Sequence, residues 1–171
     1  MTDADRFYAD QRDGVFQYLR RIVGGADAAT DLTQEVFLRV SRSGIPDTTP
    51  IGRRAWVFRI ARNLALNHVR DGRRRPTVAE LPELVSPATQ ELGVALRRAI
   101  NALPDLDRDV FLMREIAGLR YDEIAAACDV TVDTVRSRLH QARQALRREL
   151  AGSLDVRRQR RLRCSSHRPP D

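Results

Sequence analysis

Asp31 and Glu35 are the pair of side chains in this sequence best suited by spacing to acid–base chemistry. They stand four residues apart, so on a helix they would share one face. Paired carboxylates act as acid and base when a neighbouring group shifts one pKa, but no His, Cys or Lys stands near them. A hydrolase or nuclease would therefore lack its supporting residues. The remaining alternatives are a solvated helix face and, with Gln34 beside the pair, a contact site for another protein.

A second polar set could read nucleic-acid bases. Arg59, Asn63, Asn67 and Arg70 follow one another at three- and four-residue steps, so a helix would place them on one side. Asn can hydrogen-bond adenine, and Arg can contact guanine or phosphate. A polar helix surface without a binding role is the alternative. Trp56 precedes this set, and we expect it in the core rather than as a stacking platform.

A third set is basic and lies further along the chain. Arg136, His140, Arg143 and Arg147 step by four, three and four residues along one helix face. Arg136 and His140, with Ser137 between them, lie toward the N-terminal half of the predicted helix, where a recognition helix meets base edges. Arg143 and Arg147 come later and are expected at phosphates.

The elements around this third set predict a helix-turn-helix. A short helix over 121–127, a tight turn and a long helix over 132–150 have the required order. Thr131 stands where the N-cap of the second helix belongs. Asp129 stands in the turn and is among the few residues that tolerate positive φ. Cys128 is expected in the core of the unit. An ordinary solvated helix hairpin is the alternative.

The remaining periodicity predicts an all-α chain of two small helical domains. In the first domain, residues 1–75, helices are expected over 5–23, 27–41 and 53–70, with a loop over 43–50. The second domain, residues 92–150, reads as four helices. Residues 76–91 hold three prolines, three glutamates and no basic residue, which indicates an acidic linker. Residues 151–171 are arginine-rich with few apolar side chains, which predicts a disordered basic tail.

Composition points to a polyanionic partner. The 171 residues carry 30 basic and 23 acidic side chains, a formal charge of +7, and every basic residue other than histidine is arginine. Two cysteines, Cys128 and Cys164, cannot form a disulfide framework, and the histidines have no ligand-like spacing. We expect no metal and no cofactor. The acidic, polar start is unlike a signal peptide and no apolar run approaches the ~18 residues of a membrane span, so we expect a cytoplasmic protein.

Three stretches resemble the extracytoplasmic-function sigma factors of the sigma-70 family. They are AATDLTQEVFLRV at 28–40, AWVFRIARNLALNHVR at 55–70 and the long stretch from 102 to 143. The resemblance covers roughly residues 5–150. It implies a region 2 that binds core RNA polymerase and the melted −10 element, and a region 4 that binds the −35 element and the polymerase flap. It also implies that an anti-sigma factor controls the protein.

Carried onto this sequence, the resemblance assigns roles to single residues. Asn63 corresponds to a position that helps capture an unpaired −10 base, and the loop over 41–53 corresponds to the base-capturing loop. Gln141 stands where some relatives have arginine, and Asp133 stands where glycine is frequent. We predict three sites, with no catalytic residue and no metal. Their members are Asp31, Gln34 and Glu35 for polymerase; Arg59, Asn63, Asn67 and Arg70 for the −10 element; and Thr131, Arg136, Ser137, Arg138, His140, Gln141 and Arg143 for the −35 element.

The function that follows is promoter-specific initiation of transcription. The alternative is a stand-alone helix-turn-helix regulator, a class that reads paired half-sites as a dimer. No dimerisation helix or ligand domain is obvious in the sequence.

Overall fold

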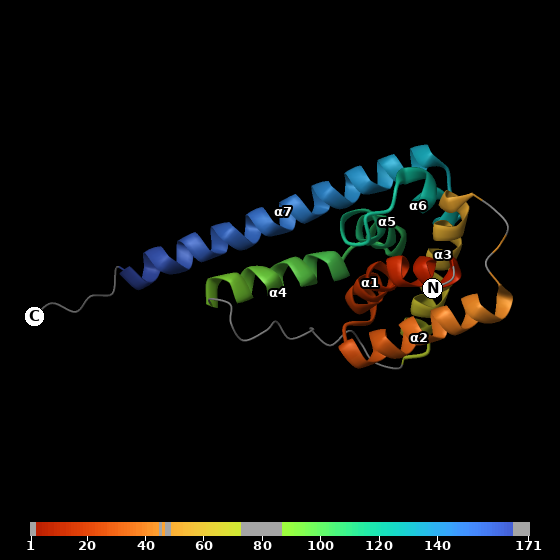
Figure 1. Ribbon diagram of the computed structural model, residues 1–171. Coiled ribbons are helices and arrows are strands. Elements are labelled where there is room, and N and C mark those ends of the chain that lie inside the picture. The colour runs from red at the N-terminus through yellow and green to blue at the C-terminus, as the bar shows by residue number, and fades with distance from the viewer. Residues whose placement is uncertain (1–2, 45, 47–48, 73–86, 166–171) are drawn as a thin grey trace, which may run out of the picture.

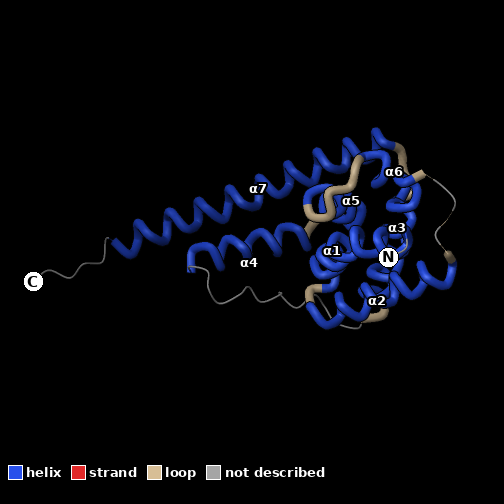
Figure 2. Tube along the Cα trace, in the orientation of Figure 1, coloured by secondary structure: helices blue, strands red, loops and turns tan. Residues whose placement is uncertain are grey.

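The computed structural model describes residues 3–44, 46, 49–72 and 87–165, and every regular element within them is a helix (Figures 1 and 2). This agrees with the predicted all-α class. The helices are α1 Asp3–Val23, α2 Ala26–Ser43, α3 Pro50–Arg70, α4 Pro87–Asn101, α5 Asp105–Glu115, α6 Tyr121–Cys128 and α7 Val132–Ser165.

The first three helices form one packing unit. α1 ends at Val23 because Gly24 adopts a positive φ of 78°, which closes the helix. α3 begins with Pro50 behind Thr49, whose hydroxyl accepts a hydrogen bond from the Gly52 N–H at 3.2 Å. The core of this three-helix unit combines buried side chains of α1, α2 and α3, namely Val15, Tyr18, Leu19, Val36, Val40, Val57, Phe58 and Ala61.

Helices α4 to α7 form the second unit, and its turn confirms two predictions. Asp129 has φ 58° and ψ 49°, the left-handed conformation expected between α6 and α7. Thr131 caps α7, because its Oγ1 accepts a hydrogen bond from the Thr134 N–H at 3.1 Å. Cys128 is buried, as predicted, and its Sγ lies 3.8 Å from Sδ of Met113.

Three boundary predictions were wrong. α3 begins at Pro50 rather than 53, because Thr49 and Pro50 supply an N-cap and a proline in the first turn. Residues 87–91, predicted as linker, begin α4. Residues 151–165, predicted as disordered, continue α7. Arginine and leucine are good helix formers, and extending an existing helix avoids the cost of nucleation.

Part of the predicted linker, 76–86, and the end of the predicted tail, 166–171, lie outside the described residues. No helix in the described ranges is long and apolar enough to cross a membrane.

The two units pack against each other rather than standing apart. α6 lies across α3, and α5 contacts α1 (Figure 1). α4 and α7 lie side by side and project away from the other helices. Buried apolar residues of both units join into one continuous core. The −10 and −35 residues predicted from sequence therefore belong to two packing units that touch.

Candidate nucleic-acid interface

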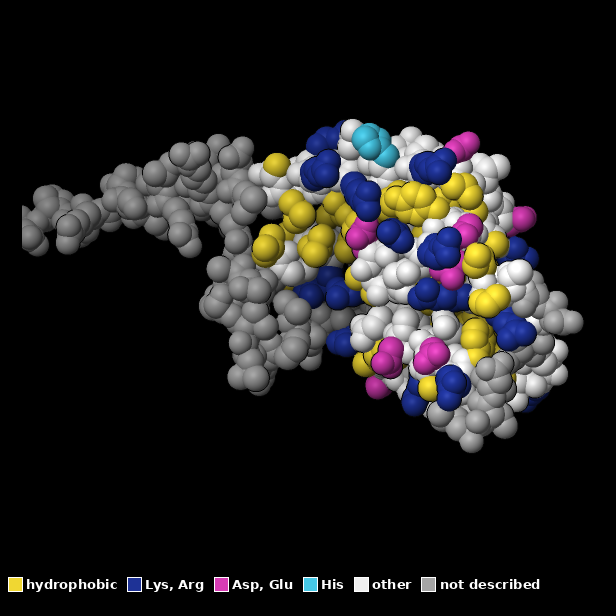
Figure 3. Space-filling model, turned by 45° about the horizontal axis from the view of Figure 1, so that its top comes forward, with side chains coloured by type: hydrophobic (Ala, Val, Ile, Leu, Met, Phe, Trp, Pro, Cys, Tyr) yellow, Lys and Arg dark blue, Asp and Glu magenta, His cyan; other side chains and the backbone are white. Residues whose placement is uncertain are grey.

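The helix-turn-helix presents an exposed arginine and an exposed histidine near the start of α7. Arg136 and His140 lie one turn apart, and both are exposed. Figure 3 shows basic side chains spread over the upper surface, with acidic side chains interspersed among them. The N-terminal half of a recognition helix, where Arg136 and His140 lie on α7, is the part that reaches the major groove. The structure thus places these two residues as the sequence predicted.

Local hydrogen bonds hold several of the predicted −35 side chains. Arg136 Nη1 lies 2.7 Å from Oδ1 of Asp133, and both side chains are largely exposed. Ser137 donates its hydroxyl to the Thr134 carbonyl at 2.9 Å. His140 Nε2 lies 2.8 Å from Nε2 of Gln144. Asp133 therefore occupies the guanidinium with which Arg136 would contact DNA.

Two predicted −35 residues turn toward α5 instead. Arg138 Nη1 lies 3.4 Å from Oδ1 of Asp107, a carboxylate that is 4% exposed. Arg143 pairs with Glu115 at the end of α5, and this hydrogen bond raises the pKa of Arg143. Both arginines link α7 to α5: Arg138 pairs with the buried Asp107, which needs a cation, and Arg143 pairs with Glu115 on the exposed surface.

Two further predicted −35 residues lie on the exposed surface of the same unit. Gln141 is exposed on α7, and Thr131 is exposed at its start. The hydroxyl of Thr131 also lies 2.9 Å from that of Thr134. Capping therefore occupies the polar group with which Thr131 would contact DNA.

The predicted −10 residues lie on the exposed side of α3, but they do not share one environment. Asn63 lines a hollow of about 340 Å³ between α2 and α3. Arg59 donates from Nη2 to the carbonyl of Ala126 in α6. Asn67 and Arg70 are exposed near the end of α3 and do not line the hollow. Asn63 is therefore the member of this set that lines a hollow of the surface.

The hollow combines cations, an aromatic ring and an amide. Trp56 is half-buried, so it both packs on the core and lines the hollow, where sequence analysis expected only a core role. The volume of the hollow falls within the range of small-ligand sites, roughly 300–1,000 Å³. Its lining residues are Arg39, Arg42, Ser43, Trp56, Ile60 and Asn63.

The predicted polymerase-binding residues lie on α2. Asp31 and Gln34 are exposed, and Glu35 accepts a hydrogen bond from Arg39 Nε at 2.7 Å. Gln34 lines a second hollow, about 430 Å³, between α1 and α2, but Asp31 and Glu35 do not. In the described part of the chain, no cluster of three or more His, Cys, Asp or Glu side chains could hold a metal ion. The carboxylate pair thus faces outward, as a contact surface would.

Sequence reasoning missed a polar network between the two units. Asp109 of α5 is 1% exposed, and it accepts hydrogen bonds from Tyr18 Oη at 3.0 Å and Arg62 Nε at 2.7 Å. Arg54 of α3 reaches Glu123 of α6, which is 5% exposed. No spacing rule links residues that are 47 to 91 positions apart. The only available signal was a charged residue beside buried apolar positions.

Comparison with known proteins agrees with this two-unit architecture. Residues 7–75 match the family description "Sigma-70 region 2", and residues 93–146 match "Sigma-70, region 4". The ECF RNA polymerase sigma-E factor of Escherichia coli is 35% identical over 134 residues, which cover 68% of this chain and 70% of that protein. The chain belongs to the ECF sigma factors of the sigma-70 family.

Further relatives and solved structures are similar. The ECF sigma factor SigE of Mycolicibacterium smegmatis is 36% identical over 163 residues, covering 88% of this chain and 63% of that relative. The sigma factor RpoE of Bartonella quintana, solved in complex with the anti-sigma factor NepR, superposes with a TM-score of 0.70 at 22% identity. That match covers 88% of this chain and 98% of RpoE. CnrH, solved with the cytosolic domain of CnrY, gives 0.65 at 22% identity, covering 89% of this chain and 87% of CnrH. Both superpositions show the same helical fold.

Within this family, α1 to α3 are the region 2 domain and α4 to α7 include the region 4 domain. The basic face of α7 and the hollow beside α3 therefore fall in different sigma regions.

Proposed function

We propose that this chain is a dissociable RNA polymerase subunit that selects promoters through two separate surfaces. The observation that carries the proposal is the hollow beside α3, which sets Asn63 among two arginines and a tryptophan. A stand-alone helix-turn-helix regulator would need only the second unit. The first unit instead offers a place for a single base, which fits a protein that stabilises melted DNA.

The hollow suits an unpaired base of the −10 element. Trp56 offers a ring face for stacking, Asn63 offers an amide that pairs with a base edge, and Arg39 and Arg42 supply positive charge for the phosphates. Unstacking a base costs a few kcal/mol, so contacts in a pocket must offset this cost. Capture of the base would hold the duplex open without any catalytic group in this chain.

The −35 element is read by α7 in this proposal. Arg136 and His140 would enter the major groove, while Arg147 would lie beside the backbone. Because Arg138 and Arg143 are held by carboxylates of α5, their role would be to fix the angle of α7. Base contacts would then select the promoter, and phosphate contacts would set affinity.

Core RNA polymerase would bind the exposed face of α2. Replacing Asp31 and Glu35 with alanine should cost fold stability no more than about 1 kcal/mol, because the Glu35–Arg39 pair is exposed. The same change should weaken binding to core polymerase by about 2 kcal/mol or more if the face is a contact hot spot.

The test is co-elution of the chain with core polymerase over a concentration series. A control replaces Asp10 and Asp105, exposed carboxylates on other helices, and so makes the same change in charge. Equal affinity for the α2 variant and the control would remove Asp31 and Glu35 from the polymerase-binding surface.

We also place the chain in the cytoplasm, where its polymerase partner works, under the control of an anti-sigma factor. RpoE of Bartonella quintana is bound by such a factor, and its fold matches this chain. An anti-sigma factor that covers the α2 face would prevent binding to core polymerase.

A further inference from the structure

Helix α7 continues well beyond the part of the chain that matches sigma-70 region 4. That match ends at residue 146, whereas α7 runs on to Ser165. We call residues 147–165 the arm. At a rise of about 1.5 Å per residue, the arm adds roughly 28 Å to the recognition helix. The roles that the family implies for region 4 therefore do not account for the arm.

The arm holds most of the net charge of the chain. Residues 147–165 include seven arginines and two acidic residues, a net charge of +5, whereas the whole chain carries +7. Residues 1–146 carry 22 arginines and 20 acidic residues, a net charge of only +2. The basic character that indicates a polyanionic partner thus comes from the arm rather than from the two regions that match the family.

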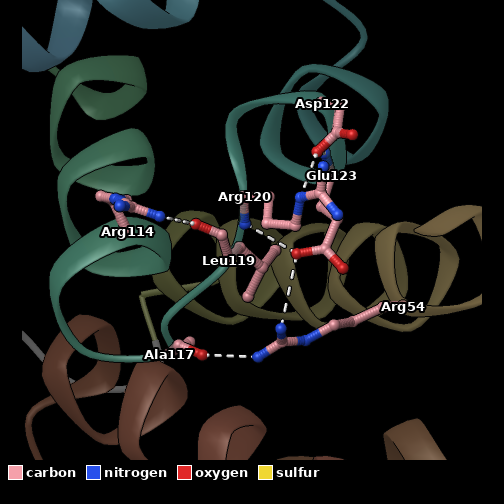
Figure 4. Close-up of polar contacts among 7 residues, drawn as sticks. All are labelled: Arg54, Arg114, Ala117, Leu119, Arg120, Asp122 and Glu123. Carbon is pink, nitrogen blue, oxygen red and sulfur yellow. Dashed lines mark hydrogen bonds and ion pairs between the residues drawn. The ribbon is translucent and has the colours of Figure 1, made fainter.

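Several arginines that precede the arm are held by carboxylates of the same chain. Arg54 binds Glu123 (Figure 4), and Arg138 and Arg143 of α7 pair with carboxylates of α5. The arm differs, because its two carboxylates cannot neutralise seven guanidiniums. Its charge therefore calls for an anionic partner from outside the arm.

The arm also projects from the body of the molecule. α4 lies beside α7, and α7 extends past the start of α4, away from the other helices (Figure 1). Leu146 is buried and Leu150 is half-buried, whereas Arg147 and Arg148 are exposed. Beyond the start of α4, no other helix of the described residues lies beside the arm. The arm is thus accessible to a large partner.

The composition of the arm favours nucleic acid over a membrane surface. A helix that lies in a membrane interface needs a continuous apolar face, with Trp, Phe or Leu on it. Residues 151–165 hold two leucines, one valine and no aromatic residue, against five arginines. Guanidinium groups suit phosphate because the two can form paired hydrogen bonds. A chain of phosphates therefore matches the arm better than a lipid surface does.

Continuity with the recognition helix places the arm beside duplex DNA. In the proposed function, Arg136 enters the major groove and Arg147 lies beside the backbone. Because the arm belongs to the same helix, it begins at the duplex that α7 reads. The distance from Arg147 to Arg163 along the helix is about 24 Å, roughly the length of seven base pairs. The step from Gly152 to Ser153, of the kind at which helices bend, would let the arm follow the duplex.

We propose that the arm binds the phosphates of duplex DNA beside the −35 element, and that it adds affinity without adding sequence preference. This inference rests on the proposed −35 role of α7. Phosphate contacts carry no sequence information. Each neutralised phosphate contributes about 0.9 to the slope of log K against log salt concentration. The arm therefore makes DNA binding by this chain steeply dependent on salt.

A variant that removes charge from the arm tests the proposal. The variant replaces five arginines of the full chain with glutamine, which has a helix propensity close to that of arginine. The control replaces the same five residues with lysine, which keeps the charge. The replaced residues are Arg157, Arg158, Arg160, Arg161 and Arg163.

Binding is measured by fluorescence anisotropy at several salt concentrations on two probes. One probe is a duplex of random sequence, and the other is the promoter pool that the wild-type chain and core polymerase select from a randomised library. We expect the glutamine variant to lose about tenfold or more in affinity on both probes, with a salt slope lower by about two to four units. The lysine variant should remain close to the wild-type chain.

Three results would overturn the proposal. A wild-type salt slope in the glutamine variant would remove DNA binding from the arm. A loss confined to the promoter pool would show that the arm reads bases. An equal loss in the lysine variant would show that charge is not what the arm supplies.

Vesicles of phosphatidylglycerol and phosphatidylcholine provide the comparison with a membrane. We expect the glutamine and wild-type chains to bind these vesicles alike. Vesicle binding that depends on the five arginines, with DNA binding that does not, would assign the arm to a membrane surface and overturn the proposal. If the wild-type chain selects no promoter with core polymerase, the proposed function fails instead, and the random duplex still reports on the arm.

Discussion

The two proposed DNA-binding surfaces differ in the contacts that their side chains make within the chain. On α7 of region 4, Arg136 and His140 are exposed, and their hydrogen-bond partners belong to the same helix. On α3 of region 2, Arg59 is bonded to α6 of the other region. The −35 surface is therefore available in this structure, whereas the −10 surface is partly occupied.

This difference indicates an order of events. DNA would meet α7 and the hollow beside α3 without rearrangement of the chain, whereas Arg59 would first have to release the Ala126 carbonyl. Residues that would read DNA directly, such as Arg136 and Asn63, are thus distinct from residues that join the two regions, such as Arg54 and Asp109. Variants of the first kind should weaken DNA binding, whereas variants of the second kind should act on the contact between the regions.

Among the residues of α7, we expect the largest loss of promoter affinity on replacing Arg136. Arg136→Ala should cost about 1–3 kcal/mol at a cognate promoter and relax preference at one or two base pairs. Arg147→Ala, about three turns later on α7, should weaken binding to all sequences about equally and lower the salt slope by about one unit. Titration of both variants against a −35 library at two salt concentrations tells them apart. Equal, sequence-independent losses would leave α7 as a phosphate clamp.

Replacing Asn63 should cause a smaller loss of DNA affinity than replacing Arg136, and the loss should depend on an unpaired −10 strand. Asn63→Ala should cost about 1–2 kcal/mol on a template with an unpaired −10 strand, because a base in the hollow would lose its amide partner. Asn67→Ala is the matched control, since Asn67 is exposed on the same helix outside the hollow. Fluorescence anisotropy on forked and fully paired templates gives the comparison. Identical losses for both variants would rule out the hollow as the base site.

Replacing Asp133 should strengthen promoter binding rather than weaken it. Its carboxylate pairs with Arg136 at 2.7 Å, and an exposed pair of this kind contributes about 0.2–1 kcal/mol. Asp133→Ala frees the arginine and removes a negative charge near DNA, so promoter affinity should rise by a similar amount. Asp129→Ala is a poor control because Asp129 has positive φ, so Asp122→Ala on α6 is used. Weaker binding by Asp133→Ala in the titration would show that the pair orients Arg136 for DNA.

The reactivity of Cys128 should report the contact between α6 and α3. Burial raises the pKa of its thiol to about 11, and Arg62 and Arg59 of α3 are among the charges that act on it. At pH 8 roughly one molecule in a thousand would carry the thiolate, so alkylation should be slow in a Cys164→Ser background. Asp109→Ala should accelerate it. An alkylation rate unchanged by that variant would show that loss of the Asp109 contacts does not expose α6.

Local rules predicted most of the helices and the turn of the helix-turn-helix. Thr131 and Asp129 were recognisable because capping and positive φ depend on neighbours in the chain. The continuation of α7 to Ser165 was missed because low apolar content was taken to exclude a helix, although helix propensity alone favours extension.

The sequence predicted which helix faces carry the candidate residues, but not which of those residues pair with other parts of the chain. Helical spacing placed Asn63 and Arg136 on exposed faces, as the structure has them. Spacing could not show that Arg138 and Arg143 pair with carboxylates of α5, or that Arg59 meets α6. Those contacts depend on tertiary packing between segments distant in sequence, which helical spacing does not reveal.

Initiation of transcription by core RNA polymerase tests the central claim most directly. The full chain is added to core polymerase on a randomised promoter library, and the 5′ ends of the transcripts are sequenced. The account predicts transcripts with defined starts downstream of two short conserved elements. It also predicts that Asn63→Ala lowers their yield. Starts no more defined than those of core polymerase alone would contradict the assignment of this chain as a promoter-selecting subunit.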